Sequence, residues 1–176
     1  KSNPHRDVLK CFKDEDVYFE IASSAELDAL LELGCCMETV FYSNPIKCPR
    51  SIKYAANKGV NWYAVDSVEE VLKIASIKPN AKLYIRIEVS NKGSTWPLAG
   101  KFGANVKEIE DIINCCKDFD MQLCGVTFHV GSQCMHPISY AKGISEIGNI
   151  IKKTKIIPDF INVGGGFPTI YPDLIP

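Results

Sequence analysis

Short runs of β-forming residues alternate with longer amphipathic segments from about residue 17 onward. This alternation is typical of βα units and a parallel sheet. The predicted strands cover residues 17–21, 40–43, 62–65, 82–89, 122–130 and 160–163, and the predicted helices cover 24–33, 49–58, 68–77, 106–119 and 137–153. The first strands recur about every 20 to 23 residues, close to one unit of a (β/α)8 TIM barrel. A doubly wound open sheet would show the same alternation.

Polar or glycine residues stand at or just past the C-terminal ends of successive predicted strands. They are Lys1, Ser23, Asn44, Asp66, Arg86, His129 with Ser132, and Gly164 with Gly165 and Gly166. A barrel gathers functional groups from many strands on that face, whereas an open sheet concentrates them near one switch point. The distribution therefore favours an α/β fold of the TIM-barrel type.

Several predicted helices begin and end at recognisable signals. Ser23 with Glu26 and Ser67 with Glu70 have the spacing of a capping box, in which a hydroxyl and a carboxylate bind helix N–H groups. Gly34 stands where a helix would end in a left-handed turn. These signals support the boundaries given above.

Three consecutive glycines, Gly164, Gly165 and Gly166, follow the last predicted strand. Residues without a Cβ let backbone N–H groups approach and converge on a phosphate. A dinucleotide-binding turn would instead space its glycines as G-x-G-x-x-G and continue into a helix, but Pro168 follows here. The stretch indicates a phosphorylated ligand, and an ordinary glycine-rich turn is the alternative.

A second polar group ends the strand predicted at 122–130. His129 alone would more often be a hydrogen-bonded core residue than a catalyst. Gly131 and Ser132 nevertheless add an amide and a hydroxyl that could bind a phosphate. In a barrel these residues and the triple glycine would come from adjacent strands, which suggests a phosphate site beside an aromatic ring.

Charge and composition exclude several classes of partner. The 176 residues carry a formal charge of −1 without a basic patch, so neither nucleic acid nor a membrane surface is an expected partner. No apolar run approaches the length of a membrane span, and the first ten residues lack a signal-peptide pattern. Without a span or a signal peptide, we expect a cytoplasmic protein. The eight cysteines form no C-x-x-C pair, which predicts reduced thiols in the core and no metal site. The long loop at 90–104 is either functional or a surface excursion anchored by Trp96 and Phe102.

Seven sequence blocks together resemble one known family. They are Lys1-Ser2-Asn3-Pro4, Phe19-Glu20-Ile21-Ala22-Ser23-x-x-Glu26, Tyr42-Ser43-Asn44-Pro45-x-Lys47, Asp66-Ser67, Lys101-Phe102-Gly103-Ala104, Phe128-His129-Val130-Gly131-Ser132-Gln133 and Gly164-Gly165-Gly166-Phe167-Pro168. In this order they resemble the barrel of the alanine-racemase-fold decarboxylases of basic amino acids, which use pyridoxal 5′-phosphate (PLP). The match covers nearly the whole chain. The run Trp96-Pro97-Leu98 lacks the arginine that eukaryotic ornithine decarboxylases have at the position of Pro97, so the chain resembles the bacterial members more closely.

The resemblance implies roles for individual residues. Lys1 would be the Schiff-base lysine and His129 would stack on the cofactor ring. Ser132 and the amides of Gly164, Gly165 and Gly166 would hold the phosphate. Glu20, which replaces the aspartate common in ornithine decarboxylases, and Glu26 and Arg86 would lie near the cofactor, and Lys101 near a dimer interface.

The resemblance also implies what the chain does and lacks. Residues 1–176 would form one PLP-binding barrel domain, truncated at both ends, without the C-terminal β-domain and inactive by itself. The whole protein would be a homodimer that decarboxylates a basic amino acid as its small-molecule substrate, with ornithine to putrescine, a step of polyamine synthesis, ahead of lysine, arginine and diaminopimelate. A catalytically silent homologue of the antizyme-inhibitor kind, or a PLP-binding homeostasis protein or racemase on the same barrel, is the alternative.

Overall fold

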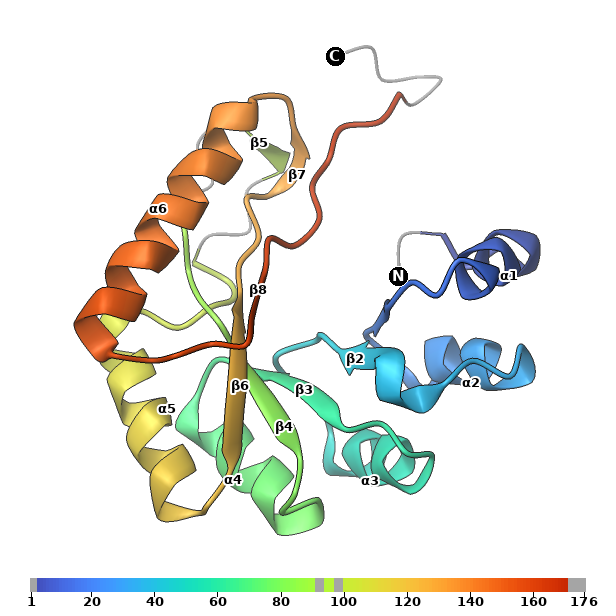
Figure 1. Cartoon of the computed structure of the whole chain (residues 1–176), viewed down its shortest axis with the longest axis horizontal. Helices are drawn as coiled ribbons and strands as arrows, with labels where there is room; N and C mark the ends of the chain where they lie inside the picture. The colour runs from blue at the N-terminus through green and yellow to red at the C-terminus, as the bar shows by residue number, and fades with distance from the viewer. Residues whose placement is uncertain (1–2, 91–93, 97–99, 171–176) are drawn as a thin grey trace.

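The computed structural model describes residues 3–90, 94–96 and 100–170. Its main sheet has six parallel strands that neighbour one another in chain order. They are β1 (Phe19–Ile21), β2 (Val40–Tyr42), β3 (Trp62–Val65), β4 (Lys82–Arg86), β6 (Gln122–Thr127) and β8 (Phe160–Asn162). The helices α2 (Ser24–Glu32), α3 (Pro49–Asn57), α4 (Val68–Ile77), α5 (Val106–Asp118) and α6 (Pro137–Thr154) follow one another around the outside of the curved sheet (Figure 1).

The sheet is curled, as a barrel requires and an open sheet does not. In a flat sheet β1 and β8 would lie five strand spacings apart, roughly 24 Å. Asn162 on β8 nevertheless donates a side-chain hydrogen bond to Glu20 on β1. Inside the curve, the rings of Phe41 on β2 and Phe160 on β8 lie 5.6 Å apart in an edge-to-face arrangement. The fold is therefore a half-barrel of the predicted TIM type.

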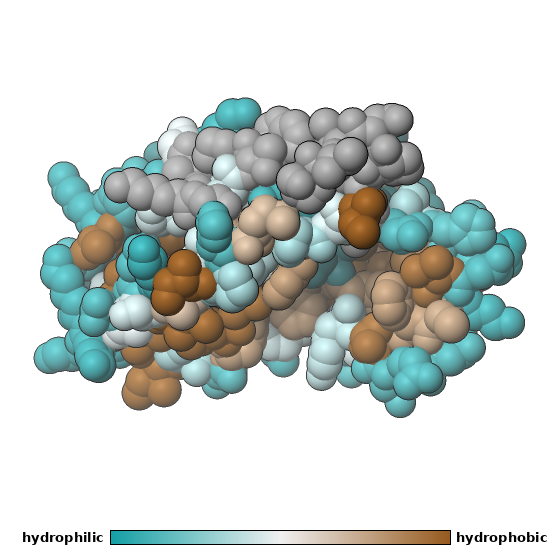
Figure 2. All heavy atoms as spheres, turned by 90° about the horizontal axis from the view of Figure 1, so that it is seen from above, coloured by the Kyte–Doolittle hydropathy of each residue, from teal (hydrophilic) through white to brown (hydrophobic). Residues whose placement is uncertain are grey.

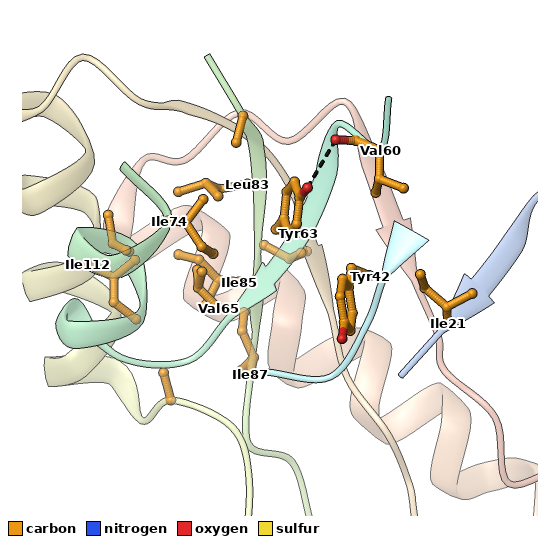
Figure 3. Packing of buried hydrophobic residues seen from close by; sticks show 14 of the residues in the cluster. Ile21, Tyr42, Val60, Tyr63, Val65, Ile74, Leu83, Ile85, Ile87 and Ile112 are labelled. Atoms are coloured by element: carbon orange, nitrogen blue, oxygen red, sulfur yellow. Dashed lines mark hydrogen bonds between the residues drawn. The ribbon is translucent and has the colours of Figure 1, made fainter. Parts of the chain in front are cut away.

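Two apolar layers stabilise this half-barrel. The outer layer lies between sheet and helices, where Ile74 of α4 and Ile112 of α5 pack near Leu83 and Ile85 of β4 (Figure 3). The inner layer is aromatic and consists of Phe41, Trp62, Tyr84 and Phe160, whose ring centroids lie 4.9 to 5.7 Å apart. Gly125 makes room for this layer, because a Cβ there would lie 2.5 Å from the Phe160 ring.

All six predicted strands and all five predicted helices are present. The strands predicted at 82–89 and 122–130 end earlier, at Arg86 and Thr127. The helix α1 (Arg6–Asp14), the 3-10 turn η1 (Met37–Thr39) and the antiparallel pair of β5 (Ser94–Trp96) with β7 (Ser132–Cys134) were not expected from the sequence.

One of the two predicted capping boxes is wrong. At α2, Ser23 accepts from the Glu26 amide and the Glu26 carboxylate accepts from the Ser23 amide, as expected. At α4, Ser67 caps the helix but Glu70 does not complete the box. The Glu70 carboxylate lies 3.0 Å from Nζ of the fully buried Lys47, and it also pairs with Lys73. A buried ion pair has replaced the local cap.

Lys47 links the segment after β2 and the C-terminal part of β3 to α4. Its Nζ donates to the carbonyls of Asn44 and Ala64 as well as to Glu70. Burial lowers the pKa of Lys47 to about 8, although the Glu70 charge opposes this shift.

The cysteines only partly follow the prediction of core packing. Cys35, Cys115, Cys116 and Cys134 are buried and Cys124 is half-buried, but Cys11, Cys36 and Cys48 are exposed. All eight are free thiols. In the described part of the chain no helix is sufficiently long and apolar to cross a membrane, and no cluster of His, Cys, Asp or Glu could hold a metal ion.

Candidate functional site

A pocket of about 650 Å³ lies where the strands of the main sheet end. Its wall includes Glu20, Arg86, His129, Ser132 and the triple glycine, and α1 adds Leu9 and Phe12. Seen from above, brown apolar atoms lie between two polar flanks and the surface is recessed between them (Figure 2). The structure thus brings polar groups from β1, β4, β6 and β8 to one site.

The glycine loop after β8 packs tightly on the loop after β6. Gly164 and Gly166 have positive φ angles of 71° and 94°. A Cβ at Gly164 would lie 2.2 Å from the Phe128 carbonyl oxygen, and one at Gly166 would lie 2.1 Å from that of Gly131. At Gly165 the nearest atom would be Nε2 of His129, 3.4 Å away. Two of the three glycines are therefore required by the neighbouring backbone, and close approach to a ligand is not their only reason.

Hydrogen bonds hold this loop from behind. Oδ1 of Asn162 accepts from the Gly164 amide at 2.8 Å. The Gly165 carbonyl accepts from the Tyr140 hydroxyl at 3.1 Å, and the Gly166 carbonyl accepts from the Cys134 amide at 2.8 Å. Within the described residues, the amides of Gly165 and Gly166 have no protein acceptor. These two donors remain available to a ligand.

Ser132 begins β7, which pairs with β5 from the long loop at 90–104. Its hydroxyl also has no hydrogen-bond partner in the part of the chain that is described. The next residue, Gln133, binds the backbone of Thr169 through both side-chain atoms, at 2.8 and 2.9 Å. This pair of hydrogen bonds joins the segment after the glycine loop to the strand that contains Ser132.

The ring of His129 lies beside Gly165 and Gly166. Its Nδ1 accepts from the Gly131 amide at 3.0 Å, which places the proton of a neutral imidazole on Nε2. That nitrogen faces Gly165. The ring is therefore oriented by its own loop and lines the pocket.

Arg86 and Glu20 also line the pocket. Burial lowers the pKa of Arg86, and the nearby charges of Asp66 and Glu20 oppose the shift, so the guanidinium stays charged. Phe102, in the Lys101-Phe102-Gly103-Ala104 block, has its ring 4.9 Å from Cζ of Arg86. Gly103 donates to Asp66 at 3.1 Å. The described end of the long loop thus packs on the site, a contact that both interpretations of the loop allow.

Two residues selected from the sequence are not part of this pocket as described. Lys1 lies outside the described residues. Glu26 is not in the pocket wall, because its carboxylate accepts from the amides of Ala22 and Ser23 at the start of α2. The role that the structure gives Glu26 is helix capping.

Sequence reasoning missed three residues that shape the site, namely Asn162, Gln133 and Tyr140. An Asn side chain often binds the backbone amide two residues on, so Asn162 carried a local signal. Tyr140 and Gln133 contact residues 25 and 36 positions away, and no local pattern reports such contacts.

The donors that line the pocket fit a phosphate. Two backbone amides and one hydroxyl that have no partner among the described residues line the pocket, and the neighbouring glycines leave the backbone uncovered. Amides of a glycine loop are favourable partners for an anion. The fold and site together are those of a half-barrel protein whose pocket fits a phosphate-bearing ligand and also holds a histidine and an arginine.

Comparison with known proteins identifies the family. Residues 1–173 match the family model described as pyridoxal-dependent decarboxylase, pyridoxal binding domain, and the chain belongs to this family. Ornithine decarboxylase of Mus musculus is 32% identical over 96% of this chain and 37% of its own length. Lysine/ornithine decarboxylase of Selenomonas ruminantium is 31% identical over 96% and 44%. The near-equal identities do not favour the bacterial branch.

Two further similarities bear on function. Antizyme inhibitor 2 of Xenopus laevis is 31% identical over 96% of this chain and 38% of its own length. The crystal structure of arginine decarboxylase from Paramecium bursaria Chlorella virus superposes with a TM-score of 0.90 at 28% identity, over 97% of this chain and 47% of that one. The chain thus spans less than half the length of these relatives.

Proposed function

We propose that this chain is the PLP-binding barrel part of a decarboxylase that acts on a basic amino acid, with ornithine as the first candidate substrate and lysine, arginine and diaminopimelate as the others. The observation that carries the proposal is the meeting of Ser132, His129 and the triple glycine in one pocket. Membership of the pyridoxal-dependent family and the names of the relatives support it.

Different residues of the pocket would bind different parts of the cofactor. The Ser132 hydroxyl and the amides of Gly165 and Gly166 would bind the phosphate, with the Gly164 amide kept in the loop by Asn162. His129 would lie beside the ring, and Arg86 and Glu20 would lie near the cofactor in the same pocket. Lys1 would supply the amine that reacts with the cofactor's aldehyde.

PLP, once bound, supplies an electron sink for the pair of electrons left when a carboxylate departs as CO2. The protein's part is to align the bond that breaks with the ring. His129 is suited to cover one face, because its own loop fixes its orientation. A ring held at its phosphate end and on one face leaves the other face for the substrate.

Further parts of the proposal concern the protein's surroundings. Eight free thiols without a disulfide are usual in a reducing compartment, which supports a cytoplasmic location. The family resemblance of the Lys101 block supports a homodimer. Neither a nucleic acid nor a membrane is proposed as a partner.

A catalytically silent homologue is the second candidate, because antizyme inhibitor 2 is also a relative. Retention of Ser132, His129 and all three glycines favours the enzyme, since a protein that only binds a partner would not need these donors in one pocket.

Spectroscopy and an activity assay test the proposal. The full-length protein purified with PLP should show an absorbance band near the visible edge, and borohydride should abolish the band and leave a pyridoxyl label on Lys1. Labelled ornithine should release CO2, with lysine and arginine assayed in parallel. Absence of the band would contradict PLP binding, and a band without CO2 release from any basic amino acid would support the silent homologue.

A further inference from the structure

Tyr140 in the first turn of α6 contacts the back of the glycine loop in two ways. Its hydroxyl donates to the Gly165 carbonyl at 3.1 Å. Its ring stacks on that of Phe167, with the centroids 4.7 Å apart and the planes at 17°. The contact joins a helix to the residues on both sides of Gly166.

The geometry of the peptide bond relates this contact to the orientation of the Gly166 amide. The carbonyl of Gly165 and the amide of Gly166 belong to one planar trans peptide, so they point in opposite directions. Because Tyr140 holds the carbonyl on the α6 side, the Gly166 amide is turned to the other side of the loop. The Cys134 amide holds the next carbonyl, that of Gly166, at 2.8 Å. Both peptides that flank the Gly166 Cα are thus fixed.

The position of α6 makes the contact possible. Gly143 lies three residues after Tyr140 and faces Phe128, where a Cβ would come within 2.5 Å of the ring. The glycine lets the helix approach the end of β6 closely. Phe128 in turn contacts Gly164 through its carbonyl oxygen. Helix, strand end and glycine loop therefore form one packed unit.

Tyr140 is also in the right chemical state to donate. Burial raises the pKa of its hydroxyl, and the nearby Cys134 adds to this effect. The group therefore keeps its proton throughout the neutral range.

We propose that Tyr140 is a positioning residue for the phosphate site, which holds the Gly165–Gly166 peptide so that the Gly166 amide faces the phosphate of the bound cofactor. This inference rests on the proposed function. It assigns a role in phosphate recognition to a side chain outside the pocket wall.

Comparison of two ligands isolates this role. Pyridoxal lacks the phosphate of PLP, so a residue that acts through the phosphate site should affect PLP binding alone. In Tyr140→Phe the ring stack on Phe167 is kept and only the hydroxyl is lost. We expect the Kd of PLP to rise about 3- to 10-fold, the size of one hydrogen bond, and the Kd of pyridoxal to stay unchanged.

Tyr54→Phe is the matched control. It removes a tyrosine hydroxyl bonded to Asp28 on the surface between α2 and α3, and it should change neither Kd. Phe167→Leu, which removes the ring partner but keeps the Tyr140 hydroxyl, should weaken PLP binding less than Tyr140→Phe. Urea denaturation of each variant verifies that it is folded before the titration.

The outcomes separate the inference from the proposed function. Equal PLP affinity in Tyr140→Phe and the unsubstituted protein would overturn the inference, and so would an equal loss for PLP and pyridoxal. If the unsubstituted protein itself bound PLP no better than pyridoxal, the phosphate site of the proposed function would fail instead.

Discussion

The side-chain amide of Asn162, at the end of β8, joins Glu20 on β1 to the amide of Gly164. Its Nδ2 donates to Oε1 of Glu20, and its Oδ1 accepts from the Gly164 amide at 2.8 Å. One residue therefore links the two outer strands of the half-barrel and fixes the start of the glycine loop.

Asn162→Ala should destabilise the fold, because a half-buried amide and a carboxylate both lose a partner. We expect the free energy of unfolding to fall by about 1 to 3 kcal/mol, measured by urea denaturation. Asn149→Ala on the exposed side of α6 is the control and should change it little. Equal midpoints for the two variants would contradict the linking role of Asn162.

The three glycines should differ in their tolerance of alanine. Gly164→Ala and Gly166→Ala place a Cβ on a backbone oxygen at positive φ, and each should cost about 2 kcal/mol or more. Gly165→Ala meets only the His129 ring and should retain most of the stability. Gly148→Ala in α6, with open space around it, should raise the melting temperature. Similar losses at all three loop positions would argue against the packing described for this loop.

Ser132→Ala should weaken PLP binding about 10- to 100-fold, since a hydrogen bond to a charged group is lost. Pyridoxal binding should stay unchanged, which a fluorescence titration of both ligands would show. Ser145→Ala, on the exposed face of α6, serves as the control. A similar loss for both ligands would place Ser132 away from the phosphate.

The stability that Lys47 contributes should depend on pH. Its pKa is about 8 in the folded protein and 10.5 ordinarily, so between these values the unfolded chain binds more protons. Folding is therefore favoured as pH rises, by at most about 1.4 kcal/mol per unit. We expect the free energy of unfolding, measured from pH 8 to pH 10, to rise more in the unsubstituted protein than in Lys47→Met.

Lys53→Met on the exposed face of α3 controls for the loss of a lysine. It should show the same pH profile as the unsubstituted protein. Parallel profiles for all three proteins would show that Lys47 titrates normally.

The order and type of the main elements could be predicted because each one has its own local pattern. Val68–Ile77 and Trp62–Val65 have the predicted bounds, since Ser67 caps the helix and the strand is almost continuously apolar. The helix Arg6–Asp14 was missed because it is only nine residues long and buries only Leu9, although Val8, Leu9 and Phe12 share one face. Leu9 and Phe12 of this helix line the pocket.

The features that the sequence did not predict depend on contacts between distant segments. Glu70 has the spacing of a capping residue, but the buried amine of Lys47, 23 residues earlier, is a stronger partner than a helix amide. The same limit applies to the site. The sequence indicated the glycines, His129 and Ser132, but gave no sign that Tyr140 would hold the loop.

Phe160 and the triple glycine lie within one stretch of seven residues, so the ribosome releases them at nearly the same time. A nascent chain that has left the ribosome only as far as β6 lacks the ring that packs on Phe41. Its inner aromatic side chains would then be open to water and to chaperones. When β8 leaves the ribosome, the Phe160 ring and the glycine loop become available together. We therefore expect the sheet to curl and the proposed phosphate site to form in the same step of translation.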